Sequence, residues 1–147
     1  MDEEVALRER LLAAAAMAIL SACPTHAQDA GEAQGSPQAR ALIERQLDAF
    51  GRDDADAAYA EAAPSIKAIF PDANAFLSMV RRGYAPVYRH RSVEFGKATS
   101  NGDTIQQEAT SVDPEGQAWK ALYRLSRQPD GTWLISACWL LKLEGAV

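Results

Sequence analysis

Between residue 36 and about residue 82, the apolar side chains are spaced as they are in helices. Ser36-Pro37 has the form of a helix N-cap followed by a proline in the first turn. Apolar residues then recur at every third or fourth position from Ala39 to Phe50. The pattern predicts helices over about 37–50, 53–63 and 72–82, with a short turn from Pro64 to Phe70. The last helix is expected to end at Arg81-Arg82-Gly83, since basic residues followed by glycine often end helices.

From Tyr84 onward, the period changes from helical to alternating. Strands are predicted over 91–99, 104–112, 117–128 and 132–143. Three turn sequences separate them, namely Ser100–Asp103, Asp113–Gly116 and Pro129–Gly131. Consecutive strands joined by short turns predict an antiparallel meander. The fold class that follows is α+β, with three N-terminal helices packed on the concave face of a curved, cone-shaped, four-stranded sheet.

The alternation along the last two strands predicts which side chains face the helices. Odd-numbered positions are almost wholly apolar and are expected to point inward: Trp119, Ala121, Tyr123, Leu125, Trp133, Ile135, Ala137, Trp139 and Leu141. Even-numbered positions are mixed, and their apolar members predict an outer surface that a second copy of the chain covers. The expected centre of this homodimer interface consists of Leu122, Leu134, Cys138 and Leu140.

The N-terminal segment has the layout of an export signal. Ten apolar residues, Leu11–Leu20, follow Arg8 and Arg10, and this run is too short to span a bilayer. Thr25-His26-Ala27 offers small residues where a signal peptidase cuts, so residues 1–27 are predicted to be a signal peptide of a periplasmic or secreted protein. In the alternative, Leu20–Cys23 is a lipobox-like end at which Cys23 is lipidated and anchors the protein to a membrane. Residues 28–36 are expected to form a flexible leader before a single domain over residues 37–144.

Composition and charge narrow the classes of partner and chemistry. The chain has 147 residues, 48% of them hydrophobic, which is enough for one core, and its net charge is −5. A mildly acidic protein has no general attraction for phosphate backbones, so nucleic acid is not an expected partner. With Cys23 in the export segment, Cys138 has no disulfide partner. His90 and Cys138 alone fall short of a metal-ligand set, and no cofactor is expected.

No catalytic constellation is visible in the sequence. Serine does not occur in a nucleophile-elbow sequence, and Cys138 is expected to be a half-buried apolar residue rather than a nucleophile. Among the acids of the sheet only Glu108 lies mid-strand, and its parity places it outside. Two alternatives to a binding module remain open: an acid–base isomerase or dehydratase that acts in the cone, and a purely structural homodimer.

A run of basic residues is the local charge anomaly. Arg81, Arg82, Arg89 and Arg91 occur with no acid between Asp72 and Glu94. If strand parity extends backward, Arg89 and Arg91 share the concave side near the mouth of the cone, and His90 points to the opposite face. Guanidinium groups suit a carboxylate or phosphate, although a solvated surface run is the alternative.

The leading hypothesis from the residues is a non-catalytic exported module that binds a small anionic ligand or a partner protein. Alanines on the inner face either receive the alanine-rich second helix directly or leave room for a pocket beneath the helices, of the concave and mostly apolar kind that binds small molecules. The expected ligand-binding residues are Arg89, Arg91, Gln107, Tyr123 and Trp139.

Three longer stretches carry a family resemblance. They are Ala41–Ile66, Phe76–Gly96 (FLSMVRRGYAPVYRHRSVEFG) and Leu122–Leu141 (LYRLSRQPDGTWLISACWLL). In these stretches the chain resembles the bacterial family of domain of unknown function 4864, and more broadly the nuclear transport factor two and ketosteroid isomerase superfamily. The resemblance implies the cone-shaped fold and no catalytic residue. The chain departs from the family at Tyr88-Arg89-His90, where Tyr-Arg-Pro is usual, and from the superfamily at Pro64–Pro71, where a hairpin is usual.

Overall fold

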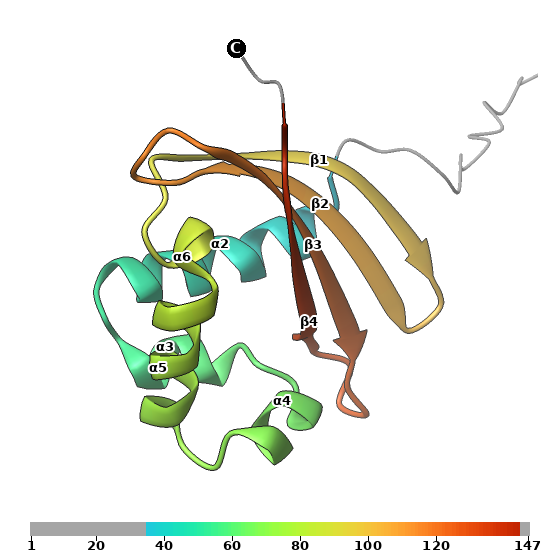
Figure 1. Cartoon of the computed structure of the whole chain (residues 1–147). Coiled ribbons are helices and arrows are strands. Elements are labelled where there is room, and N and C mark those ends of the chain that lie inside the picture. Colours follow the sequence, from blue (N-terminus) through green and yellow to red (C-terminus); the bar gives the residue numbers. More distant parts are fainter. Residues whose placement is uncertain (1–34, 145–147) are drawn as a thin grey trace, which may run out of the picture.

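The computed structural model describes residues 35–144 as five helices followed by four strands (Figure 1). The helices are α2 (Pro37–Gly51), α3 (Ala55–Ala60), α4 (Pro64–Ile69), α5 (Ala73–Gly83) and α6 (Ala85–Tyr88). The strands are β1 (Ser92–Asn101), β2 (Thr104–Val112), β3 (Ala118–Arg127) and β4 (Trp133–Lys142). They form one antiparallel sheet in the order β1-β2-β3-β4, which confirms the predicted α+β class with helices before strands. The predicted signal peptide and Cys23 lie outside the described residues.

Three of the helices begin at residues whose side chains cap them. The Ser36 hydroxyl accepts a hydrogen bond from the backbone N–H of Ala39, at 3.3 Å. Carboxylates do the same at α3 and α5, where Asp54 and Asp72 accept from N–H groups three residues later, at 3.1 Å and 2.7 Å. Each cap satisfies an N–H that the helix itself leaves without a partner. Within residues 35–144, no helix has the length and apolar character that a membrane span requires.

The middle of the helical region differs from the prediction. The expected helix over 53–63 ends at Ala60, because the backbone beyond it pairs with β4: Ile135 donates to the Glu61 carbonyl at 2.9 Å, and Ala63 donates to the Ile135 carbonyl at 2.7 Å. The segment expected to be a turn is the short helix α4. The alternating period was also predicted to begin at Tyr84, whereas α6 occupies the next four residues.

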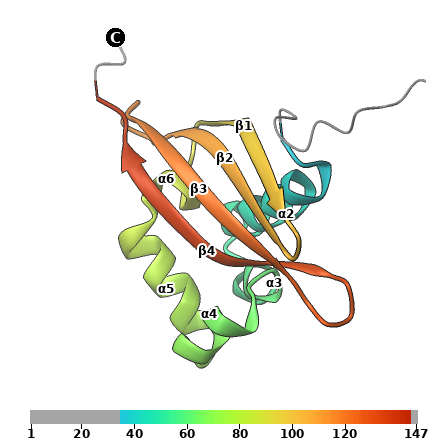
Figure 2. The same ribbon diagram turned by 90° about the vertical axis from the view of Figure 1, so that its right-hand side faces the viewer.

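The helices lie on the concave side of a curved sheet (Figures 1 and 2). Helix α2 contributes Leu42, Ile43 and Leu47 to the core, and the strands contribute Ile105, Leu125 and Ile135 from their inner face. Ala109 and Ala121 face each other across β2 and β3 and are almost fully buried. These small side chains let the helices approach the sheet closely. The core therefore lies between the helices and the concave face.

A β-bulge in β4 reverses the predicted facing of its second half. The pairing of β3 with β4 shifts between Arg124↔Ala137 and Leu125↔Ile135, so that Ser136 is an extra residue in the ladder. One extra residue moves every later side chain to the other face. Before the bulge, Ile135 is buried as predicted.

After the bulge, the prediction is wrong. Cys138 and Leu140, expected on the outer face, pack against the core. Ala137 pairs with the exposed Arg124 on the outer face, and Trp139 and Leu141, expected inside, are 44% and 58% exposed. The predicted interface centre thus loses Cys138 and Leu140 to the core.

Candidate functional site

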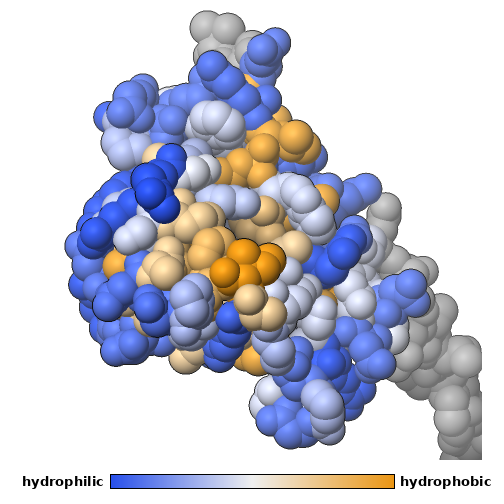
Figure 3. Space-filling view, turned by 60° about the horizontal axis from the view of Figure 1, so that its bottom comes forward, coloured by the Kyte–Doolittle hydropathy of each residue, from blue (hydrophilic) through white to orange (hydrophobic). Residues whose placement is uncertain are grey.

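A cavity of about 310 Å³ opens between the helices and the last two strands. Helices α5 and α6 form one wall with Phe76, Met79, Val80 and Val87. The remaining helical lining comes from Gln46 and Phe50 of α2, and from Ile66 and Phe70 at α4. Figure 3 shows the underside of the molecule, where α4 and α5 lie in Figure 1, and apolar side chains gather there within a hydrophilic surround.

The aromatic part of the wall is built around Phe76. Its ring centroid lies 6.2 Å from that of Phe50, 6.0 Å from that of Phe70 and 5.7 Å from that of Tyr59. The Tyr59 hydroxyl donates to the Phe70 carbonyl at 2.6 Å, which connects α3 to the end of α4. Tilted and edge-on ring pairs at these distances are favourable. These contacts hold the aromatic wall in place without a ligand.

The polar groups of the lining come from Gln46, from Tyr84 and from the strands. Tyr123 is 2% exposed, and its hydroxyl forms a hydrogen bond with the Cys138 thiol. Tyr84, at the junction of α5 and α6, donates its hydroxyl to the Cys138 carbonyl at 3.2 Å. No charged side chain belongs to the described lining.

Burial keeps the ionisable groups of the cavity neutral. It raises the pKa of Cys138 to about 12, although the Tyr123 hydrogen bond acts in the opposite direction. Burial also raises the pKa of Tyr84, and it raises that of Tyr123 well above its ordinary value. A neutral thiol is a poor nucleophile, and phenols with raised pKa values do not act as bases near pH 7.

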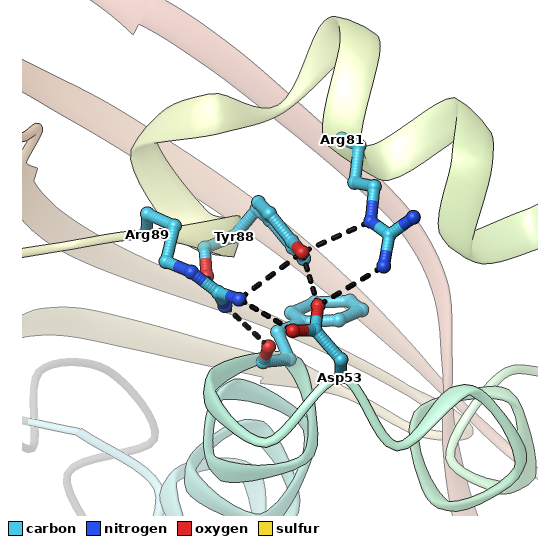
Figure 4. A network of polar contacts seen from close by, with 5 residues as sticks. Asp53, Arg81, Tyr88 and Arg89 are labelled. Atoms are coloured by element: carbon cyan, nitrogen blue, oxygen red, sulfur yellow. Dashed lines mark hydrogen bonds and ion pairs between the residues drawn. The ribbon is translucent and has the colours of Figure 1, made fainter.

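A polar network connects Asp53, Arg81, Tyr88 and Arg89, none of which belongs to the cavity lining (Figure 4). Asp53 lies in the loop between α2 and α3 with a φ of 53°, the left-handed region. Its carboxylate accepts hydrogen bonds from Arg81 at 3.2 Å, from Arg89 at 2.8 Å and from the Tyr88 hydroxyl. Arg89 also donates to the Phe50 carbonyl at 2.6 Å. The network thus ties α5 and α6 to the C-terminal end of α2.

The single carboxylate of the network is shared by two guanidinium groups. The Tyr88 hydrogen bond is the largest cause of a lowered Asp53 pKa, and Arg81 and Arg89 act in the same direction. The Arg89 guanidinium also lies over the Tyr88 ring, 4.1 Å from its centroid. Arg89 is therefore engaged by groups of its own chain.

The predicted arginine pair lines a separate groove of about 720 Å³ instead of the cavity. Arg89 and Arg91 share this groove, which runs along α2 and the start of β1, with Glu44 and Asp48 on its other side. His90 lines it as well and does not point to the opposite face as predicted. The parity argument failed because β1 begins only at Ser92, so that no strand extends back through these residues.

The other predicted ligand-binding residues are separated. Tyr123 lines the cavity, and Trp139 does so at the strand edge, where Arg124 lies 5.0 Å from its ring centroid. Gln107 is fully buried elsewhere: its Nε2 donates to the Gly96 carbonyl at 3.0 Å, and its Oε1 accepts from the Ser36 N–H at 2.9 Å. Gln107 therefore connects the irregular part of β1 to the start of α2 through hydrogen bonds.

Gln46, like Tyr84, is a polar lining residue that the sequence reasoning missed. A signal for it was available, since Gln46 follows Leu42 and Ile43 at helical spacing and thus falls on the apolar face of its helix. A polar residue on a buried face needs a partner.

As to metals, residues 35–144 bring together no group of three His, Cys, Asp or Glu side chains.

Comparison with known proteins extends this description to a family. A family model described as domain of unknown function (DUF4864) matches residues 32–147. The match includes all the helices and strands described above. A search of curated proteins found no match.

Proposed function

The chain belongs to the DUF4864 family, and we propose that its domain binds a small, uncharged, mostly apolar molecule in the cavity between the helices and β4. The observation that carries the proposal is an open space of about 310 Å³ whose described lining includes no charge. Protein interiors are normally close-packed, and ligand pockets are mostly apolar with a few polar groups. The size suits a molecule of one or two rings.

Binding is favoured over catalysis by the protonation states of the lining. Tyr84, Tyr123 and Cys138 are all held neutral near pH 7. An isomerase or dehydratase needs a group that exchanges a proton close to neutral pH. The alternative enzyme would thus need an acid or base that the described lining does not supply.

The charge of the ligand follows from the same lining. An anion that entered the cavity would lose its hydration without gaining a cationic partner. An anionic ligand, as predicted from Arg89 and Arg91, would have to bind in the separate groove. We therefore assign an uncharged ligand to the cavity and treat the groove as a second hypothesis, tested below.

For the location of the protein we propose export, as the sequence predicts. Export to the periplasm or to the medium rests on Leu11–Leu20 and Thr25–Ala27, and lipidation at Cys23 is the alternative. These residues lie outside the described part of the chain. Helices on the concave side of a curved sheet support the proposed place in the cone-shaped superfamily.

A neutral fluorescent probe tests the cavity. 1-Naphthylamine should bind the purified wild-type protein saturably, because its two fused aromatic rings match the size and the apolar lining of the cavity. Met79→Trp should weaken the probe by about tenfold or more, since Met79 lines the cavity and a larger ring would fill it.

Ser78→Trp provides the matched control on the same helix. Ser78 is exposed and does not belong to the lining, so this variant should bind the probe as the wild type does. Absence of saturable binding to the wild type would refute the proposal. Equal binding by the two tryptophan variants would place the probe elsewhere and would also refute it.

A further inference from the structure

Gln46 is a residue of the cavity lining whose amide oxygen has no hydrogen-bond donor among the described residues. It lies on α2, is 4% exposed and belongs to the cavity lining. Its Nε2 donates to the Ala58 carbonyl at 3.2 Å. Because a carbonyl can only accept, this contact determines the orientation of the amide and leaves Oε1 as the free end.

The free oxygen has no donor of its own. Among residues 35–144, no group donates a hydrogen bond to Gln46 Oε1, and the oxygen is not sealed off as a buried unsatisfied atom. It therefore keeps accessible surface, although nearly all of its residue is buried. A ligand that covered this oxygen without donating to it would leave a buried acceptor unpaired, which is costly.

Tyr123 is a second polar group in the same lining. Its side chain is 2% exposed, and the hydroxyl has the Cys138 thiol as its partner. A thiol is a weak donor and a weak acceptor, so the hydroxyl keeps most of its hydrogen-bonding capacity. Two buried polar groups with unused capacity thus face one apolar space.

The rest of the lining defines the body of the molecule that this space can hold. Phe50, Phe70 and Phe76 form a wall of aromatic rings, and Met79 supplies a polarisable thioether. Such a wall favours a flat ring over an extended chain, because ring faces and edges pack well against one another.

Building on the proposed function, we propose that Gln46 Oε1 accepts a hydrogen bond from the ligand, and that the ligand is an uncharged aromatic molecule of one or two rings with a hydroxyl or N–H donor. Tyr123 offers its hydroxyl to a second polar atom of the same molecule. The class excludes carboxylates and phosphates, which find no cation in this lining. It also excludes pure hydrocarbons as preferred ligands, since these would leave the Gln46 acceptor unpaired.

A pair of shape-matched probes tests the acceptor directly. Indole and benzofuran have nearly the same outline, but only indole carries an N–H donor. Titration calorimetry on the purified wild-type protein should give indole an affinity about tenfold higher, the size expected for one buried hydrogen bond. Gln46→Met keeps the length of the side chain and removes the oxygen. In that variant the preference for indole should fall to within about twofold, because neither probe then meets the amide oxygen.

Two outcomes would overturn the inference. One is a wild-type protein that binds both probes equally, and the other is a Gln46→Met variant that keeps the tenfold preference. Because this substitution also removes the contact with Ala58, thermal melting must show that the variant is folded, and Gln46→Leu replaces it if it is not. Binding of both probes with equal affinity would leave the proposed function standing. A wild-type protein that binds neither indole, benzofuran nor the naphthylamine would instead refute the proposed function itself.

Discussion

Arg89 has a structural set of contacts rather than the geometry of an open anion site. Its guanidinium donates to the Phe50 carbonyl and to Asp53, and it lies over the ring of Tyr88. The side chain is still 41% exposed, so solvent weakens the ion pair. The bond to a backbone carbonyl is the more valuable contact, because it holds α6 to the end of α2.

We expect Arg89→Ala to lower the free energy of unfolding by about 1 kcal/mol, through the lost bond to the Phe50 carbonyl. Arg91→Ala is the matched control and should have a smaller effect. The difference between wild type and Arg89→Ala should also depend on pH. A lowered Asp53 pKa stabilises the fold above the ordinary range near pH 3.9, and this contribution is lost as the pH falls through the folded-state pKa.

The difference in the free energy of unfolding between wild type and Arg89→Ala should therefore be present at pH 7 and should shrink below about pH 4, as measured by denaturant unfolding across this range. The opposite result is equally informative. If Arg89→Ala unfolds as the wild type does, and phosphate or citrate raises the melting temperature of the wild type alone, then Arg89 binds an anion in the groove as the sequence predicted.

At the scale of the element, β4 shows how one residue changes a whole surface. The extra residue, Ser136, lies in the strand, and its hydroxyl donates to the Arg124 carbonyl at 3.2 Å. Beyond it, Leu140 faces the core and Leu141 faces outward, although both are leucines in one strand. The facing of this strand segment is thus a property of its pairing with β3.

Adjacent leucines provide the test of this facing. Leu140→Ala should cost about 1–2 kcal/mol of unfolding free energy, because the side chain packs against the core but is only partly buried. Leu141→Ala should change stability by less than about 0.5 kcal/mol, as exposed substitutions usually do. Chemical denaturation of the two variants measures both values. A larger loss for Leu141→Ala would show that the bulge is not where the structure has it.

At the scale of the whole molecule, the outer sheet face is where the sequence predicts a homodimer interface. Leu122 and Leu134 lie on it as predicted, and the bulge adds Trp139 and Leu141. These four residues gather on β3 and β4, whereas Thr104, Gln106, Glu108 and Thr110 occupy the outer face of β2. The predicted interface is therefore moved toward the β4 edge.

Leu122→Glu should convert a wild-type dimer to a monomer in sedimentation velocity, because a carboxylate would be buried at the centre of the interface. Gln106→Glu places the same charge on the polar half of the face and should leave the dimer intact. A wild-type protein that sediments as a monomer at high concentration would rule out the homodimer.

Local chemistry explains which features of this protein were determined by the sequence alone. The start of α2 depends on Ser36-Pro37, and β2 has its predicted bounds because strong turn sequences flank it. The α+β class follows from the change of period, which involves only neighbouring residues. Such signals act over a few positions and can be read without the fold.

Competition between distant segments decided the remainder. Helix α3 ends at Ala60 because the backbone groups of Glu61 and Ala63 pair with Ile135. The second half of β4 faces the opposite way from the prediction because its pairing with β3 leaves out Ser136. The cavity likewise exists only where α2, α5 and β4 meet, and the free end of Gln46 depends on a contact with α3. In each case the local sequence is compatible with both the predicted and the observed arrangement. Their energies differ only through partners that folding brings together, so the tertiary structure alone could decide between them.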